Sequence, residues 1–245
     1  MTRHLNVWMG ADEALFSMRA WRARANTALT MDEFAGQAAH IGLDLASKTD
    51  LASCVLTFPT NAPNGALSYV TFHRSFLNEA AVLEARNPAY PGWAADGYLT
   101  VTEGNETDFA RIEAWLLECC ARFKILSVAY DPWAATQFAQ RMMAEGVPMV
   151  EFRATTQNFS EPTKELDAAM RGGRLQHDGD PVLEWAIGNV VGRYDARANV
   201  YPRKSRVENK IDPAVALIMT IGRCLANNEE ESAYNNPATR SSIWI

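Results

Sequence analysis

The chain has 245 residues, of which 48% are hydrophobic and 21% charged, and its formal net charge is −6. This composition suits a globular protein with one sizeable core and excludes a fibrous or wholly disordered chain. The acidic balance argues mildly against a nucleic-acid-binding protein, although a carboxylate cluster that holds a metal ion would also add negative charge. The four cysteines lack zinc-type spacing, which favours a reduced, cytoplasmic protein, and no apolar run is long enough to span a bilayer.

Residues 1–38 form a separate N-terminal segment, in which aromatic and apolar residues recur at roughly helical spacing. A second short helix is expected to start at Thr30, and the segment has too little bulk to fold without packing on a neighbour. The stretch HIGLDLAS (40–47) then alternates apolar with small or polar residues, which predicts a strand. Two more strands, over 51–59 and 67–77, complete a predicted antiparallel meander. Residues 76–106, interrupted by Asn-Pro and Pro-Gly, are predicted to be loop.

A strong amphipathic pattern predicts a helix after an N-cap at Thr107, followed by the strand KILSVAY (124–130), a helix over 132–145 and the strand VPMVEFR (147–153). This alternation demands parallel strands. Further helices are expected from Ser160 to 172, over 181–191 and over 213–226, with a basic loop (193–210) before the last and a polar tail after it. Three antiparallel strands, then parallel strands flanked by helices, is the α/β mixed-sheet order of the ribonuclease H-like fold.

Two aspartates lie inside or directly after predicted strands. Asp44 lies inside HIGLDLAS with only Gly42 and Ala46 beside it on its face, which leaves room above the carboxylate for a ligand; the alternative is an acid facing solvent. Asp131 follows the strand 124–130, and in the expected fold it would lie beside Asp44. Two carboxylates that close repel each other unless a cation lies between them. Oxygen ligands without His or Cys favour Mg²⁺ or Mn²⁺.

Asp212, before the last predicted helix, is the third candidate ligand. Asp-Pro occurs three times, at 131–132, 180–181 and 212–213, each time before an apolar periodic segment. Aspartate before a proline at the first helical position is an ordinary N-cap, so capping alone would explain all three. The pattern does not separate a ligand from a cap, and one residue can be both.

Three stretches carry a family resemblance: HIGLDLASKTDLASCVLTFP (40–59), residues 129–191 beginning AYDPWAATQF, and NKIDPAVALIM (209–219). In this order they resemble the nuclease domain of the large terminase subunits of tailed bacteriophages, in the cohesive-end or HK97-like branch. The resemblance covers residues from about 41 to 226 and implies a nuclease domain over 39–226 and a polar tail over 227–245. Residues 1–38 resemble the connector that follows the packaging ATPase in that family.

The resemblance implies an endonuclease that cuts concatemeric viral double-stranded DNA during packaging, in the cytoplasm of the infected host. It implies two divalent cations, Mg²⁺ or Mn²⁺, on a catalytic triad of Asp44, Asp131 and Asp212, whereas Asp180 keeps a capping role. Partners in the full motor would be an ATPase domain, the small terminase subunit and the portal or procapsid. No GxxxxGK[ST] motif is present, so the chain is expected to be an isolated domain or a split gene product that does not translocate DNA alone.

The most basic window, residues 193–210, is proposed as a phosphate clamp through Arg203, Lys204, Arg206 and Lys210; the alternative is a solvated loop. Lys48 is a further candidate phosphate contact.

Other polar residues have weaker cases. The stretch His177-Asp178-Gly179 is read as a tight turn rather than a catalytic pair, and Asp50 as a strand-start residue rather than an auxiliary ligand. Large apolar residues of the helices are expected to pack in the core, namely Trp115, Trp133, Trp185, Met142 and Met143.

Two other functions stay open beside the endonuclease. One is a docking module for the portal or the ATPase domain with little activity of its own, to which the acidic and apolar tail (229–231 and 243–245) would contribute. The other is a different ribonuclease H-like nuclease of the resolvase type.

Overall fold

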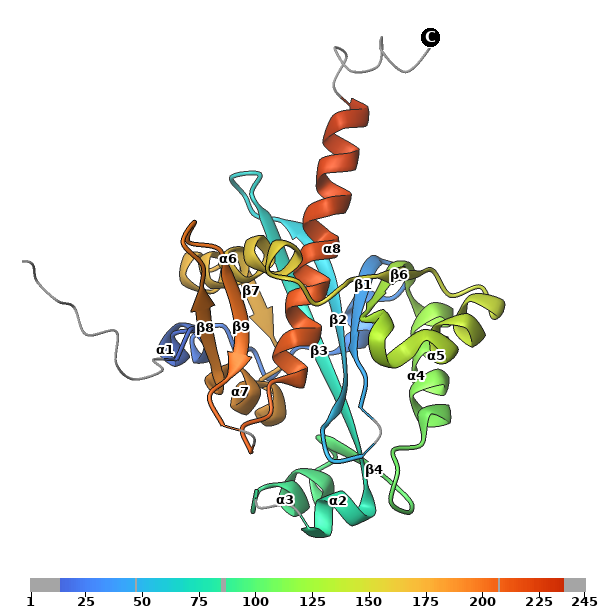
Figure 1. The fold of residues 1–245 in the computed structure, drawn as a ribbon. Helices are drawn as coiled ribbons and strands as arrows, with labels where there is room; N and C mark the ends of the chain where they lie inside the picture. The colour runs from blue at the N-terminus through green and yellow to red at the C-terminus, as the bar shows by residue number, and fades with distance from the viewer. Residues whose placement is uncertain (1–13, 47, 85–86, 207, 236–245) are drawn as a thin grey trace, which may run out of the picture.

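The computed structural model describes residues 14–46, 48–84, 87–206 and 208–235. Its centre is a mixed sheet of order β4-β3-β2-β1-β5-β6 (Figure 1). The strands are β1 (Ala38–Asp44), β2 (Ala52–Asn61), β3 (Leu67–Asn78), β4 (Leu99–Thr102), β5 (Lys124–Tyr130) and β6 (Met149–Glu151). β1, β2 and β3 pair antiparallel, whereas β5 pairs parallel with β1 and with β6. The predicted ribonuclease H-like mixed sheet is therefore confirmed.

Helices cover both faces of the sheet, and each face has its own core. α4 (Phe109–Arg122) and α5 (Pro132–Ala144) pack on one face, where the buried residues include Ile41, Leu43 and Leu56. α6 (Thr156–Gly172), α7 (Pro181–Gly188) and α8 (Asp212–Asn235) pack on the other face, with Val55 and Ala129. The alternation of inward residues along β1 follows from the period of two in the sequence.

The described part of the N-terminal segment packs on both cores, with α1 on the second core and Leu29, Met31 and Phe34 on the first. In α1 (Met18–Arg22) the indole of Trp21 is fully buried and stacks on the His177 ring, with ring centroids 4.0 Å apart. The short 3₁₀ helix η1 (Met31–Phe34) begins after Thr30, as predicted, with a capping box to Glu33. The segment therefore packs within this chain, while its role as a connector stays a prediction.

Several element predictions were wrong in detail. Residues 76–106 contain the end of β3, α2 (Glu79–Glu84), α3 (Tyr90–Ala95) and β4 rather than loop. The basic window contains a hairpin of β8 (Val190–Tyr194) and β9 (Val200–Lys204), so α7 ends before residue 190, and β7 (Leu175–His177) pairs with β3. The N-caps of α4 and α6 are Asp108 and Thr155 instead of Thr107 and Ser160. α8 continues past the expected boundary at 226 to Asn235, since polar residues also sustain a helix; residues 236–245 lie outside the described part.

α8 approaches β1 very closely at Gly42. A Cβ built at Gly42 would lie 2.1 Å from the carbonyl oxygen of Ala216, so only glycine fits this position without a shift. The hydroxyls of Thr57 on β2 and Thr220 on α8 are 2.8 Å apart and tie the same two layers together. The room that the sequence leaves beside Asp44 is thus filled, at Gly42, by the backbone of α8.

Within the described ranges, no helix combines the length and apolar character needed to cross a membrane.

Candidate active site

Asp44 and Asp131 leave the sheet at the same edge because their strands are parallel neighbours. Leu43 of β1 is in register with Tyr130 of β5, so the next residue of each chain segment is an aspartate. The Asp131 carboxylate also accepts a hydrogen bond from the backbone N–H of Trp133, at 3.1 Å, and caps α5. Asp131 therefore caps the helix as expected and also lies beside Asp44.

Asp212 is the first residue of α8, and the contact between Gly42 and Ala216 sets this helix against β1. Asp44, Asp131 and Asp212 all line one cavity of about 290 Å³. Three acids from three separate elements thus face a shared hollow, as the sequence predicted for its candidate triad.

The electrostatics of this cavity disfavour three free carboxylates. Burial, followed by the charges of Asp212 and Asp131, raises the pKa of Asp44 well above its ordinary value. Burial and then the Asp50 carboxylate raise the pKa of Asp212 to about 6. The charges of Asp131 and Asp44 also add to the effect of burial in raising the pKa of the Tyr201 phenol. Asp44 and Asp212 therefore hold a proton more readily than ordinary carboxylates do, although the charge of Lys204 offsets part of the effect at both.

The predicted phosphate contacts divide into two groups. Arg203 and Lys204, at the end of β9, line the cavity of the acids. The ammonium group of Lys210 is hydrogen-bonded to Asp50, which lies 3.8 Å from the ammonium group of Lys204. Asp50 thus holds two lysines beside the acids and is an ion-pair partner in the turn before β2.

Two predicted contacts lie farther from the acids. Arg206 and Lys48 are exposed and are not among the residues that line the cavity; the Lys48 carbonyl accepts a hydrogen bond from Asn78.

The donor set fits hard divalent cations. Three carboxylates without a histidine or cysteine among them are oxygen ligands of the kind Mg²⁺ and Mn²⁺ prefer, and a cation would relieve the repulsion that helps to raise the pKa of Asp44 and of Asp212. Among the described residues, no three acidic, histidine or cysteine side chains are already gathered closely enough to hold a metal ion. The fit therefore rests on the chemistry of the acids and on the cavity they share.

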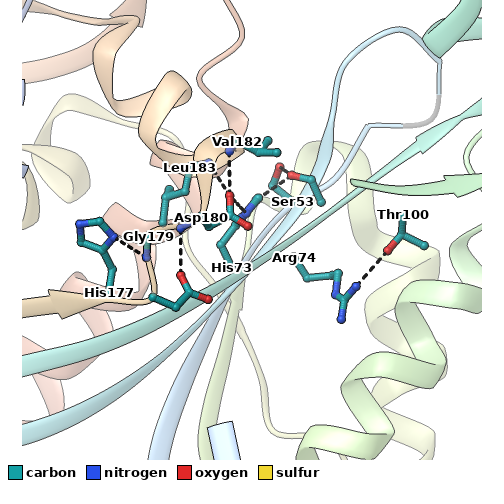
Figure 2. A network of polar contacts seen from close by, with 11 residues as sticks. Ser53, His73, Arg74, Thr100, His177, Gly179, Asp180, Val182 and Leu183 are labelled. Atoms are coloured by element: carbon teal, nitrogen blue, oxygen red, sulfur yellow. Dashed lines mark hydrogen bonds and ion pairs between the residues drawn. The ribbon is translucent and has the colours of Figure 1, made fainter. Parts of the chain in front are cut away.

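The remaining Asp-Pro pair, Asp180-Pro181, belongs to a different network of polar contacts (Figure 2). The Asp180 carboxylate accepts hydrogen bonds from the backbone N–H groups of Val182 and Leu183, both at 2.8 Å, and so caps α7. It also lies 3.1 Å from Nδ1 of His73, whose Nε2 is 2.7 Å from the Ser75 hydroxyl. Burial acts to raise the pKa of Asp180, but His73 and the two amide donors outweigh it and lower that pKa.

His177 is a structural residue of the same region. Its Nδ1 accepts a hydrogen bond from the N–H of Gly179, its Nε2 donates to the carbonyl of Trp21, and Gly179 has a φ of +87°. The expected turn at 177–179 is therefore present.

Trp133 is the residue that the sequence interpretation misplaced most. It was expected in the core, yet it is 96% exposed, and Met143 on the same helix is 47% exposed. The buried residues of α5 are Ala135, Phe138, Ala139 and Met142, at a helical spacing that excludes both. Counting this apolar stripe would have placed Trp133 at the surface, two residues from Asp131. Met142, Trp115 and Trp185 do pack on the cores, as expected.

A model of the family described as the endonuclease domain of the terminase large subunit matches residues 1–229. Among curated proteins, the chain is 35% identical over 246 residues to protein YmfN of Escherichia coli K12, an alignment that covers 94% of this chain and 53% of YmfN. It is 31% identical over 196 residues to the terminase large subunit of Enterobacteria phage HK97, covering 78% of this chain and 38% of that protein. The chain thus spans about half or less of the curated relatives.

Two solved structures extend these similarities to the fold. The crystal structure of the HK97 large terminase matches with a TM-score of 0.74 and 27% identity, over 86% of this chain and 43% of that chain. The large terminase nuclease of thermophilic phage G20c with bound magnesium matches with a TM-score of 0.52 and 14% identity, over 87% of this chain and 99% of that chain.

Proposed function

Because the chain belongs to the family of terminase large subunit endonuclease domains, we propose that it is a divalent-metal-dependent endonuclease that cuts concatemeric viral double-stranded DNA. The observation that carries the proposal is the convergence of Asp44, Asp131 and Asp212 on one cavity, with the pKa of Asp44 raised by burial and by the other two acids. Uncompensated buried carboxylates are costly to a fold, so their convergence at one edge of the sheet points to a bound cation.

Two divalent cations, Mg²⁺ or Mn²⁺, would supply the activated water and the charge that stabilises the leaving 3′ oxygen. The chain's own part is to hold these cations and to orient the DNA. Asp44 and Asp131 are fixed by the sheet, and Asp212 by the helix that packs on it, so the carboxylates need little rearrangement. No side-chain nucleophile is required, and the expected products carry a 5′-phosphate and a 3′-hydroxyl. The magnesium in the G20c nuclease supports this choice of metal.

Arg203 and Lys204 are the residues best placed to contact a phosphate in this cavity, because both line it. Lys210 would affect the cavity indirectly, through its ion pair with Asp50. Lys48 and Arg206 would contact DNA only outside the cavity.

The wider setting is proposed from the family. An ATPase domain, the small terminase subunit and the portal or procapsid would be the partners, in the cytoplasm of the infected host. Since this chain carries no P-loop motif, ATP hydrolysis would come from another polypeptide segment.

The test is cleavage of supercoiled plasmid DNA with Mg²⁺ or Mn²⁺, with EDTA as the metal-free control. Asp44→Asn and Asp131→Asn should lose cutting, while Asp167→Asn, a surface variant on α6 whose acid pairs with Arg171, should keep it. Asparagine still caps a helix, so Asp131→Asn separates the capping role from the ligand role. Calorimetric titration with Mn²⁺ gives a readout independent of activity. Equal cutting and equal Mn²⁺ binding by all variants would exclude the proposed site.

A further inference from the structure

The side chain of Trp133 is almost fully exposed, which is unusual for tryptophan, the largest of the apolar residue types. It is 96% exposed at the start of α5, one proline away from Asp131, whose carboxylate accepts the hydrogen bond of its own backbone N–H. The apolar stripe of α5 is complete without it, so its exposure is no consequence of poor packing of the helix. A single exposed apolar side chain needs no ligand to explain it, so the case for Trp133 rests on its surroundings, a groove that it lines together with Asp131 and Arg153.

The surface around Trp133 is hollowed, and this hollow shares two of its lining residues, Asp131 and Ala154, with the cavity of the acids. Trp133 and Arg153 line an open groove of about 520 Å³ that also includes Asp131 and Ala154. Ala154 and Asp131 in turn line the cavity that contains Asp44 and Asp212. Ala154 belongs as well to a third hollow, of about 460 Å³, lined by Arg193 and Tyr194. The three hollows therefore meet at Ala154, with the acids beside the junction.

Aromatic and basic side chains flank the acids along this combined groove. Trp133 and Arg153 lie on the α5 side, and Arg193 and Tyr194 on the side of the β8–β9 hairpin, where Tyr194 is 55% exposed. Two acids also lie near these basic residues. Glu151 forms an ion pair with Arg153 at 3.2 Å, and the Asp195 carboxylate accepts a hydrogen bond from the backbone N–H of Asn199 in the hairpin turn. Arginines combined with exposed aromatic rings are the groups that bind the backbone and the bases of a nucleic acid strand.

We infer that the groove through these three hollows holds the DNA strand that is cut, and that the Trp133 indole packs on the base or deoxyribose beside the scissile phosphate. The inference rests on the proposed function and deepens it. Arg153 and Arg193 contact phosphates on the two sides of the scissile phosphate. The strand therefore runs from the hollow beside α5, over the acids, to the hollow beside the β8–β9 hairpin. Trp133 is thereby a positioning residue that fixes which phosphate reaches the metal site.

The test compares Trp133→Ala with Trp133→Phe and with Met143→Ala, a matched loss of an exposed apolar side chain ten residues further along the same helix. Binding of a fluorescent duplex is measured in EDTA, and the Michaelis constant for cutting is measured with Mn²⁺. Trp133→Ala should weaken binding and raise the Michaelis constant by about 5- to 100-fold, the range found for loss of one base–aromatic stack. Trp133→Phe should recover most of the loss, and Met143→Ala should stay within about 2-fold of the parent.

Photocrosslinking supplies a readout that a merely structural role would not change. DNA substituted with 5-iodouracil couples to aromatic side chains in contact with it, so the wild type should crosslink at Trp133 and Trp133→Ala should not. If the wild type binds DNA and crosslinks at Trp133 but cuts none, the cleavage proposal fails, whereas the inferred contact between DNA and Trp133 in this groove stands. If the wild type cuts DNA and Trp133→Ala binds, crosslinks and cuts equally well, the inference is overturned. A wild type that neither binds nor cuts DNA would overturn both.

Discussion

Asp180 and Asp212 begin from the same local sequence and reach opposite electrostatic states. Each precedes a proline at the start of a helix, yet Asp180 is held by His73 and two backbone N–H groups, which lower its pKa. Asp212 instead faces a cavity shared with two other acids, and its pKa is raised to about 6. Ionised Asp180 therefore stabilises the fold, whereas ionised Asp212 destabilises it. The difference lies in partners that are distant in the sequence, and it marks Asp212 as the acid available to a ligand.

Substitutions of Asp212 and Asp180 should differ most in their effect on the rate of DNA cutting. Asp212→Asn is expected to reduce DNA cutting on the order of 1,000-fold or more, because loss of even a supporting partner of a metal ligand costs about 10–100-fold. The folded fraction of Asp180→Ala should cut at close to the wild-type rate. Initial rates of plasmid nicking, normalised to folded protein by circular dichroism, decide between them. A catalytic loss in Asp180→Ala as deep as that in Asp212→Asn would contradict the comparison.

Stability should show the reverse ranking. Asp180→Ala leaves the buried His73 without its acidic partner and removes the cap of α7, so the free energy of unfolding should fall by about 3–5 kcal/mol. Urea denaturation followed by circular dichroism measures this change. The matched control is Asp167→Ala, which removes an exposed ion pair with Arg171 and should cost less than about 1 kcal/mol. Equal losses for the two variants would show that the buried network contributes nothing special.

Asp212→Asn should make the metal-free protein more stable. The folded-state pKa of about 6 lies above the ordinary value of 3.8, so the folded state binds a proton more readily than the unfolded state. The resulting penalty is absent below about pH 4, grows as the pH rises to 6, and is complete above that. In EDTA at pH 7.5 the variant should gain about 1–3 kcal/mol, and the gain should vanish at pH 4.

The pH profile of Asp180 should have the opposite sign. Its pKa is lowered in the folded state, so its stabilising contribution is present above the unfolded pKa and is lost as the pH falls through the folded value. Denaturation of both variants and the wild type from about pH 2 to pH 7.5 tests the pair of profiles together, because the Asp180 contribution is lost only below its unfolded pKa of 3.8. Parallel profiles for Asp180→Ala and Asp212→Asn would refute the assigned difference between the acids.

The smallest expected effect concerns Asp50, which pairs with Lys210 and lies near Lys204. Its charge also helps to raise the pKa of Asp212. Asp50→Asn should lower the pKa of Asp212 and weaken Mn²⁺ binding by about 5-fold, the effect of removing one charge from the surroundings of the cation. Calorimetric titration measures both, since fewer protons are released on binding at pH 6. Loss of Mn²⁺ binding comparable to that of Asp212→Asn would make Asp50 a ligand rather than a neighbour.

The sheet and the three candidate acids could be predicted because their signals are local or strictly periodic. The alternation around Asp44 and the acid at the end of the strand 124–130 are visible in a few residues, and parallel pairing of β1 with β5 follows from the order of elements. The resemblance of the longer stretches to terminase nucleases then supplied the role of Asp212, which its own position left open.

The missed features depend on contacts that no short window contains. His73 and Asp180 are 107 residues apart, so their pairing has no signature in either segment. β4 and the helices α2 and α3 are only four to six residues long, too short for a periodic pattern. The β8–β9 hairpin was read partly as the end of the helix over 181–191 and partly as loop, because the buried Val190 and Val191 continue an apolar helical pattern and the buried Val200 stands alone among polar residues.

The contact of Gly42 with Ala216 determines how the site tolerates change. The backbones of β1 and α8 meet where Gly42 contacts Ala216. Asp44 lies two residues after Gly42 on β1, and Asp212 lies about one helical turn before Ala216 on α8. The spacing of the two acids is therefore governed by main-chain atoms, which no substitution elsewhere in the core alters directly. A side chain at position 42 would push α8 away from β1 and so change the separation of Asp44 and Asp212.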